Sequence, residues 1–225
     1  MRPHPRRLLG LFGRAPNVDN AYEPELTAAI ERVVRRGWTC VDVGAHVGNV
    51  TETLARLVGP SGRVVAFEAH PDNAAALRQR FEGAPIVEVV DAAVSDGESD
   101  RLRLYAGRHD YSAEWNVVGH DVEGVPTRPV LEVQAVALDG WFSPADAVHF
   151  VKVDVEGAEG LVLTGMRSVL RHQRPVVAVE FHDEDGWAGR RELLEAGYVL
   201  SRPDGSPVDP AGPRVYHVIA RPSRA

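Results

Sequence analysis

Two kinds of apolar pattern alternate along the chain. In the first kind, several consecutive residues are mostly apolar, as in strands that are buried on both faces. Runs of this kind cover residues 39–43, 63–68, 86–90, 148–154 and 175–181. In the second kind, apolar residues recur every three or four positions, as on one face of a helix. The helices that this spacing predicts cover residues 24–37, 49–57, 71–81, 157–170 and 187–196. Buried strands that alternate with helices predict an α/β fold, in which a parallel sheet has helices on both faces.

Two segments depart from this alternation. Residues 100–147 contain no convincing helix, only the strand-like pieces LRLY and VLEVQAVAL around a polar, aromatic-bearing loop at about 107–129. We interpret that loop as a lid-like insertion, with an ordinary surface insertion as the alternative. After the last helix, residues 198–201 and 215–220 flank a turn rich in Pro, Gly and Asp. This arrangement predicts a C-terminal antiparallel hairpin that closes the sheet.

The composition indicates one domain with a sizeable core. The chain has 225 residues, of which 44% are hydrophobic. No run approaches the roughly 18 to 20 apolar residues that a membrane helix needs, so we expect no transmembrane segment. Residues 1–20 carry four arginines against one aspartate. We therefore expect a basic, flexible tail over residues 1–20 and a single domain over residues 21–225.

Charge and cysteine content narrow the partners and the compartment. The formal net charge is −7; because residues 1–20 carry +3, the rest of the chain carries −10. An acidic body argues against nucleic acid as the main partner, since Lys and Arg supply phosphate contacts. The apolar stretch at 8–12 is shorter than the roughly 7 to 15 residues of a secretory signal. Cys40 is the sole cysteine, which excludes an internal disulfide, so we expect a cytoplasmic protein.

The segment CVDVGAHVGN lies between a predicted strand and the next helix, which is where open α/β sheets bind ligands. A dinucleotide fingerprint that starts at Gly44 needs glycine at positions 46 and 49, but His46 and Asn49 stand there. The loop therefore argues against a pyrophosphate cradle. It disfavours a nicotinamide-dependent oxidoreductase for the same reason.

What remains in this loop suits a ligand with a positive charge. Asp42 ends the strand and can attract a cationic group. Gly44 and Gly48, with Ala45 between them, let the backbone approach a ligand closely. Glu68 ends the second strand 20 residues after Gly48, where an acid can accept both hydrogen bonds of a ribose diol. S-adenosylmethionine has an ammonium, a sulfonium and a ribose diol, and it matches these requirements without a phosphate.

The third strand ends in VVDAAVSD, beside the same crevice. There we expect the Asp91 carboxylate or the Ala92 backbone amide to contact adenine. An aspartate that simply begins a turn is the structural alternative.

The segment VKVDVEGAEG contains Lys152, the only lysine of the chain. The other 24 of the 25 basic residues are arginine. Alternate side chains of a strand share a face, so Lys152 and Asp154 point the same way. An unpaired ammonium among valines would be costly, so we expect a carboxylate partner, which Asp154, Glu180 or Asp42 can supply. Lys152 would then fix the carboxylates at the strand ends. Direct contact with the acceptor or its proton is the alternative role.

Acidic residues and a histidine follow the fourth and fifth strands. Asp154 and Glu156 lie where the next helix begins, and VEFHDED adds Glu180 and His182. Methyl transfer needs a group that helps to remove the acceptor's proton, and histidine has a suitable pKa. We expect His182 to be this base, with His46 as the second candidate and a local hydrogen bond as the alternative role of His182. The carboxylates can orient a base or hold Mg²⁺, but without tight ligand spacing we expect no metal ion.

Three segments resemble a known family. They are VDVGAHVGNVTETLA, GRVVAFEAHPDN and VKVDVEGAEGLVLTGM, in that order, with YEPEL ahead of them. Over roughly residues 22–200 the chain resembles the FkbM family of S-adenosylmethionine-dependent methyltransferases. The glycine loop is generic to class I methyltransferases, whereas the pattern K-x-D-x-E-G-x-E is much more specific to this family. Two positions depart from it, since His46 replaces an Asn and Ala69 stands where a Pro usually follows Glu68.

The resemblance implies the class I methyltransferase fold, a Rossmann-like, mostly parallel sheet of seven strands. It places the cofactor over the ends of strands one to three and the acceptor near the ends of strands four and five. The implied activity is O-methylation of a small-molecule hydroxyl, on a sugar or a natural-product scaffold. N-methylation of a small molecule or peptide and a non-catalytic binding role stay open, and so does a homodimer.

Overall fold

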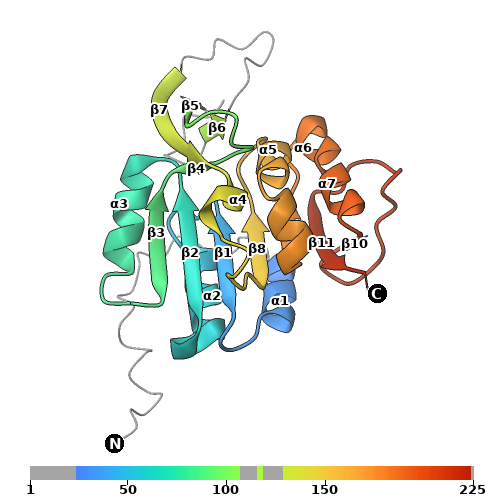
Figure 1. The fold of residues 1–225 in the computed structure, drawn as a ribbon, viewed down its shortest axis with the longest axis horizontal. Coiled ribbons are helices and arrows are strands. Elements are labelled where there is room, and N and C mark those ends of the chain that lie inside the picture. Colours follow the sequence, from blue (N-terminus) through green and yellow to red (C-terminus); the bar gives the residue numbers. More distant parts are fainter. Residues whose placement is uncertain (1–23, 107–115, 119–128, 224–225) are drawn as a thin grey trace, which may run out of the picture.

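The computed structural model describes residues 24–106, 116–118 and 129–223. Its centre is a seven-stranded sheet in the order β10-β11-β9-β8-β1-β2-β3 (Figure 1). These strands are β1 (Thr39–Val43), β2 (Arg63–Glu68), β3 (Val87–Asp91), β8 (Phe150–Val153), β9 (Val176–Glu180), β10 (Tyr198–Ser201) and β11 (His217–Pro222). The pairs from β3 to β9 are parallel, while β11 runs antiparallel to both β9 and β10. The predicted α/β sheet and its C-terminal antiparallel hairpin are thus confirmed.

A second, smaller sheet leaves the main one after β3. Its strands are β4 (Ala93–Val94), β5 (Arg101–Ala106), β6 (Asn116–Val118) and β7 (Pro129–Val136), in the order β4-β7-β5-β6. The β5 strand pairs antiparallel with β6 and β7, and the short β4–β7 pairing is parallel. The two strand-like pieces of the sequence are therefore β5 and β7. Apart from β6 and the start of β7, the predicted lid at about 107–129 lies outside the described residues, as does the predicted tail at 1–20.

The helices differ from the prediction in three places. They are α1 (Pro24–Val33), α2 (Asn49–Val58), the 3₁₀ turn η2 (Gly59–Ser61), α3 (Pro71–Arg80), α4 (Leu138–Trp141), α5 (Glu159–Thr164), the π-helical turn η3 (Val169–Gln173), α6 (Glu184–Ala188) and α7 (Arg190–Glu195). The α4 helix lies where we expected none, because its single turn is too short to show a period. The helices expected at 157–170 and 187–196 are each divided.

Close backbone contacts explain both divisions. A Cβ atom at Gly165 would lie 1.9 Å from the Ser95 carbonyl oxygen, so the α5 segment meets the chain before β5 at a glycine. A Cβ atom at Gly189 would lie 2.5 Å from the Gly160 Cα atom, so α5 and the α6–α7 junction touch backbone to backbone. Such approaches need residues without a side chain. Apolar spacing along the sequence carries no trace of them.

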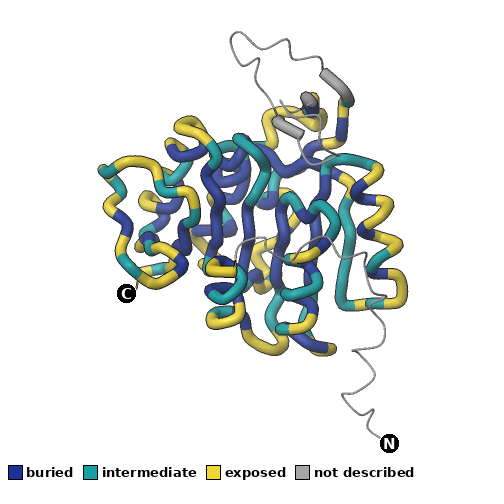
Figure 2. Tube along the Cα trace, turned by 180° about the vertical axis from the view of Figure 1, so that it is seen from behind, coloured by how far each residue is buried: buried dark blue, intermediate teal, exposed yellow. Residues whose placement is uncertain are grey.

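The core has one apolar layer on each face of the main sheet. On one face, Cys40 and Phe150 pack with Leu54 of α2 and with α1. On the other face, Val41 belongs to a larger cluster that includes Leu163 of α5. Figure 2 shows the strands as mostly buried, with exposed positions on the outer sides of the helices. The polar residues at the strand ends are therefore held by a rigid, dry sheet.

The helices of the described residues are all too short or too polar to cross a membrane.

Candidate active site

Five neighbouring parallel strands, β9, β8, β1, β2 and β3, end at one edge of the sheet (Figure 1). The predicted residues lie at or just after these ends. Asp42 of β1 is in register with Ala66 of β2 and with Lys152 of β8. Lys152 is in register with Ala178 of β9 in turn. Because these strands are parallel, the loops that follow them meet at this edge. The glycine turn, the carboxylates and the histidine named above all lie in or next to these loops.

The glycine turn after β1 is fixed from both sides. Gly44 has a φ of +77°, and a Cβ atom there would lie 1.8 Å from the Asp154 carbonyl oxygen. The amides of Gly44 and Ala45 both donate to the Phe67 carbonyl at 3.0 Å. Gly48 has a φ of +89° and packs against Leu77, whose Cδ1 atom would lie 2.6 Å from a Cβ atom. Both glycines thus serve close packing of the chain on itself, and their approach to a ligand stays a prediction.

Asp42 is buried beneath this turn and has no exposed surface. Its Oδ2 atom accepts a hydrogen bond from the Thr51 hydroxyl at 2.6 Å, and its Oδ1 atom lies 3.7 Å from the Lys152 ammonium. Burial raises the pKa of Asp42 above its usual range, and Lys152 and Thr51 oppose this shift only in part. The carboxylate has no exposed surface in this conformation, so the direct cofactor contact that we expected for Asp42 stays a prediction. Among the described residues, Asp42 pairs with Lys152.

Lys152 links three groups at the strand ends. Its Nζ atom lies 2.9 Å from Asp154 Oδ2 and donates to the Gly44 carbonyl at 3.2 Å, in addition to the contact with Asp42. Only 3% of the residue is exposed. Burial lowers its pKa, but Asp154 and Asp42 outweigh burial and raise the pKa above its usual range. These contacts favour the structural role for Lys152 over direct contact with a substrate.

Glu68 ties the glycine turn to the start of α3. Its Oε2 atom accepts from the His46 amide at 2.8 Å, and its Oε1 atom accepts from the His70 amide at 2.9 Å. A third donor, Asn73 Nδ2, is 3.4 Å from Oε1. His46, the second candidate for the base, contributes its amide to this network from a backbone with a φ of +50°. A carboxylate has about four acceptor positions, so Glu68 keeps capacity for a ligand.

The end of β3 lies next to Glu68. Asp91 is in register with Glu68, and its exposed carboxylate lies 3.3 Å from Arg78. The Ala92 amide donates to the Glu68 carbonyl at 3.1 Å, so it is already engaged. Of the two adenine contacts considered, only the one from the Asp91 side chain is open in this conformation. Both residues stay predicted cofactor contacts.

Four carboxylates surround His182, and we call them the acidic group: Asp154, Glu156, Glu159 and Glu180. The His182 Nδ1 atom is 2.8 Å from Glu159 Oε1. Its Nε2 atom is 3.4 Å from Glu156 Oε2 and 3.6 Å from Asp154 Oδ1. The Tyr216 hydroxyl also lies 3.1 Å from Nε2. The structure therefore joins four of the predicted catalytic residues, from Lys152 through Asp154 to His182 and Glu156.

The charges around His182 change its expected protonation. Burial lowers its pKa, but the hydrogen bond to Glu159 and the charges of Glu156, Glu159 and Asp154 outweigh burial and raise the pKa to about 9. His182 is therefore mostly an imidazolium at neutral pH. Burial raises the pKa of Glu156 to about 7, with His182 acting in the opposite direction. Near neutral pH, Glu156 is thus better suited than His182 to accept a proton.

Three contributors were missed by the sequence analysis: Thr51, Glu159 and Tyr216. Glu159 is the last acid of the K-x-D-x-E-G-x-E pattern, so the sequence marked this residue, but we assigned it no role in the site. Thr51 of α2 and Tyr216 before β11 gave no signal, because their partners lie on other elements: Asp42 is on β1 and His182 follows β9. The sequence distance to His182 is 34 residues for Tyr216 and 23 for Glu159.

The arrangement also offers a candidate for metal binding. Asp154, Glu180 and His182 each have a ligand atom, and these atoms lie within 4.8 Å of one another, the one such group among residues 24–106, 116–118 and 129–223. Two protein cations already lie in the same group, because the Lys152 ammonium contacts Asp154 and His182 is protonated at neutral pH. Both cations repel a metal ion and so oppose its binding at this group. Metal binding there stays an alternative to our expectation of no metal ion.

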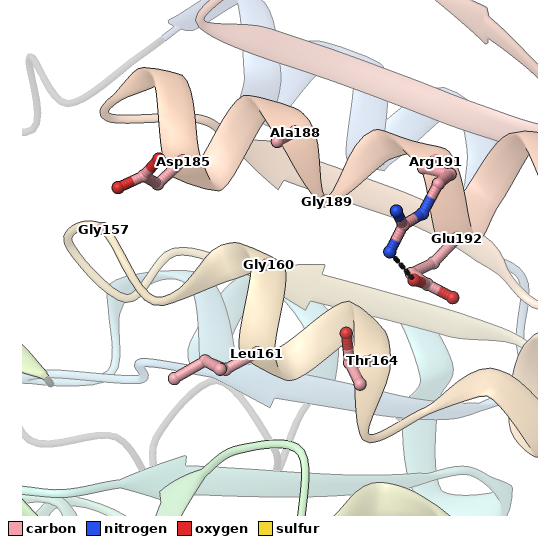
Figure 3. A pocket seen from close by; sticks show the side chains of 9 residues that line it. All are labelled: Gly157, Gly160, Leu161, Thr164, Asp185, Ala188, Gly189, Arg191 and Glu192. Atoms are coloured by element: carbon pink, nitrogen blue, oxygen red, sulfur yellow. Dashed lines mark hydrogen bonds and ion pairs between the residues drawn. The ribbon is translucent and has the colours of Figure 1, made fainter.

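A groove runs between α5 and the α6–α7 segment and begins at Gly157, next to the acidic group (Figure 3). Leu161 of α5 lines one side, and Arg191 and Glu192 of α7 line its far end, where their side chains form an ion pair at 3.3 Å. The groove lies along helices and does not reach the glycine turn. It is therefore separate from the predicted cofactor site.

Comparisons with known proteins agree with the fold and the motifs. A family model described as the methyltransferase FkbM domain matches residues 42–200. A curated relative, the catalytic subunit of tRNA (adenine(58)-N(1))-methyltransferase from Cryptococcus neoformans, is 28% identical over 108 residues. That match covers 46% of this chain and 25% of the relative, so the chain spans about a quarter of its length.

Solved structures share the fold at low sequence identity. The FkbM methyltransferase from Methylobacillus flagellatus superimposes with a TM-score of 0.53 and 16% identity, over 84% of this chain and 48% of that chain. The fibrillarin from Aeropyrum pernix, solved with natively bound S-adenosyl-L-methionine, gives a TM-score of 0.52 and 12% identity, over 90% and 76% of the two chains. These likenesses concern the fold. The family model covers more than two thirds of the 225 residues of this chain. The chain therefore belongs to the FkbM methyltransferase family.

Proposed function

We propose that this chain binds S-adenosylmethionine across the ends of β1, β2 and β3 and methylates a hydroxyl of a small-molecule acceptor. The observation that carries the proposal is the group of Asp154, Glu156 and His182 at the ends of β8 and β9, beside the glycine turn. When bound, S-adenosylmethionine supplies a methyl group on a sulfonium. A sugar or a natural-product scaffold is the acceptor class that we propose.

The residues at the edge of the sheet fit this cofactor. Three of the roughly four acceptor positions of Glu68 have donors, which leaves one for a ribose hydroxyl, and Asp91 lies next to Glu68 in register. The acidic group favours a cation such as a sulfonium by charge. The turn from Gly44 to Gly48 offers no glycine pattern for a pyrophosphate. These features together support a charged nucleoside without phosphate.

The proposed chemistry places the chain's residues on the acceptor side. Held by Glu68 and Asp91, the cofactor would supply its methyl group to the acceptor oxygen and would leave as the neutral thioether with the electron pair of the carbon–sulfur bond. The acceptor's hydroxyl proton passes to Glu156, whose side chain is 30% exposed and whose pKa is raised to about 7 by burial. Asp154 is held by Lys152 at 2.9 Å and orients the acceptor. His182 supplies positive charge next to Glu156.

Transfer of a radiolabelled methyl group tests this proposal. Labelled S-adenosylmethionine is incubated with a panel of hydroxylated sugars and polyketide scaffolds, with amine acceptors and with unmodified tRNA as separate arms. We expect label in hydroxyl acceptors. Label in tRNA or amines alone would overturn the O-methylation proposal while keeping a methyltransferase.

Variants separate catalysis from binding. Asp154→Asn and Glu156→Gln should lower turnover while leaving the affinity for S-adenosylhomocysteine within about twofold, because both residues lie on the acceptor side. The matched control is Asp146→Asn, which removes a partly exposed carboxylate that is hydrogen-bonded to Ser143 and lies away from the acidic group. A non-catalytic binding protein would show cofactor affinity and no transfer in any arm.

N-methylation of a nucleobase is the second candidate, and one observation favours it. The relative that acts on adenine in tRNA matches 46% of this chain. Against it stands the charge of −10 on residues 21–225, since nucleic-acid partners need basic surfaces. The tRNA arm of the transfer assay decides between the two.

A further inference from the structure

We propose that Glu159 is a positioning residue that holds the His182 imidazole by its Nδ1 atom, so that Nε2 faces Glu156 and Asp154. This inference rests on the proposed function, because it assigns His182 and Glu156 to the acceptor side of a methyl transfer. Glu159 does not touch the acceptor itself. It acts through His182 and through the loop that carries Glu156.

Glu159 occupies a site that is built around its carboxylate. It lies in the first turn of α5 with no exposed surface. Its Oε2 atom faces Gly186 of α6, where a Cβ atom would lie only 2.2 Å away. Any side chain at position 186 would therefore push the carboxylate aside. The absence of a side chain at Gly186 leaves the room that Glu159 occupies.

The other oxygen of Glu159 does two things at once. Oε1 lies 2.8 Å from His182 Nδ1 and also accepts a hydrogen bond from the Gly157 amide at 2.9 Å. A buried carboxylate is unfavourable unless it is hydrogen-bonded or paired, and these two donors satisfy Oε1, while Oε2 is buried without a hydrogen-bond partner among the described residues. Oε1 thus fixes both the imidazole and the loop at Gly157.

The backbone of the loop between Asp154 and Glu159 has an unfavourable conformation, which other contacts must stabilise. Glu156 has a φ of +52°, which is rare for a residue with a side chain, and Gly157 has a φ of +100°. Glu159 accepts a hydrogen bond from the Gly157 amide, which directly follows Glu156, and it also contacts His182. These two contacts fix the position of Glu156 relative to His182, and the Nε2–Oε2 distance of 3.4 Å depends on them.

The orientation of an imidazole by a buried carboxylate has a known consequence. When one ring nitrogen bonds a carboxylate, the other is presented in a fixed direction and the imidazolium form is stabilised. Charged and titratable groups reach His182 from every element around it. They are Asp154 after β8, Glu156 in the loop, Glu159 of α5, Glu180 of β9 and Tyr216 before β11. Of these groups, Glu159 contacts Nδ1, whereas Asp154, Glu156 and Tyr216 lie at Nε2.

Titration of the His182 ring by nuclear magnetic resonance, with ¹⁵N-labelled protein and no ligand, tests the inference. In Glu159→Gln we expect the apparent pKa of His182 to fall by at least one pKa unit from the wild-type value near 9. The ring should also lose its fixed orientation, seen as averaged ¹⁵N shifts. Glu192→Gln is the matched control, because Glu192 is also a buried helical carboxylate but is bonded to Arg167. It should lower stability and leave His182 unchanged.

A second variant keeps the test open if Glu159→Gln does not fold. Gly186→Ala places a methyl group against Oε2 and should shift the His182 titration in the same direction. An unchanged titration in the folded variants, or an equal change in Glu192→Gln, would overturn the inference. Because the readout needs neither cofactor nor acceptor, failure of the transfer assay with an intact titration effect would refute the proposed function alone.

Discussion

Removing the buried ammonium of Lys152 gives the sharpest test of the network beneath the glycine turn. In Lys152→Met the side chain keeps its length but leaves Asp42 buried without a cation. The Asp42 carboxylate has no exposed surface, and its Oδ1 atom is 3.7 Å from Nζ. With an effective dielectric constant of about 20, the lost attraction to Asp42 is about 4.5 kcal/mol. The contact to Asp154 adds less than its 2.9 Å distance suggests, because 26% of that side chain is exposed.

We therefore expect Lys152→Met to lower the free energy of unfolding by about 3 to 5 kcal/mol at pH 7, which is the range for an orphaned buried charge. The assay is urea unfolding at 25 °C, followed by circular dichroism. The pKa of Asp42 is already raised, and an acid with a raised folded-state pKa loses stability as the pH increases through that value. The deficit should thus be larger at pH 8 than at pH 5.

A double variant separates charge from packing. Lys152→Met combined with Asp42→Asn removes both charges and keeps an acceptor for Thr51, so it should recover about 2 kcal/mol or more relative to Lys152→Met alone. Arg191→Met is the control for a surface cation, since its side chain is 69% exposed, and it should change stability by less than about 0.5 kcal/mol. A loss under about 1 kcal/mol in Lys152→Met, or a double variant as unstable as the sum of the singles, would refute this reasoning.

Three further predictions concern the same sheet edge. Gly44→Ala should prevent folding or lower stability by more than about 3 kcal/mol, since its Cβ atom would lie 1.8 Å from the Asp154 carbonyl oxygen. Gly205→Ala is the control, because Gly205 has a similar φ but open space around it, and it should lose only about 1 to 2 kcal/mol. Equal losses in the two variants would argue against the clash. The pKa of His182 is raised from 6.5 to about 9, so its contribution to stability is complete below pH 6.5 and is lost as the pH rises to 9. The melting temperature of the wild type should fall more over this range than that of His182→Asn, and parallel curves would contradict the shift. Burial raises the pKa of Cys40 to about 12, so the folded protein should resist iodoacetamide at pH 8 and react only after unfolding; rapid labelling in native buffer would contradict the burial.

The sheet could be predicted because its signal is local. Each parallel strand is a short Val-rich run, and the observed bounds of β1 and β2 coincide with the predicted ones. The helices at 157–170 and 187–196 were harder, because Gly165 and Gly189 divide them through contacts with distant backbone. The short α4 helix has too few residues for a period. Local patterns thus predict the elements, and tertiary contacts decide where they break.

The site could be predicted in part for the same reason. Strand ends gave Asp42, Glu68 and Asp154, because parallel strands bring their carboxyl ends together. The sequence could not show that Asp42 is fully buried, or that Glu159 reaches His182, since both depend on side-chain packing between elements. The imidazolium state of His182 has the same origin. Proximity of acids in space sets the pKa, and the sequence gives only their order.

The affinity of the protein for S-adenosylhomocysteine, measured by isothermal titration calorimetry, tests the central claim most directly. We predict saturable binding of one molecule per chain to the wild type, binding at least about tenfold weaker to Glu68→Gln, and no heat from NAD. A ligand at 100 times its dissociation constant should add about 2.7 kcal/mol of stability, which gives an independent check by thermal unfolding. Binding of NAD in place of S-adenosylhomocysteine, or equal affinity in Glu68→Gln, would contradict the account of this sheet edge as a cofactor site.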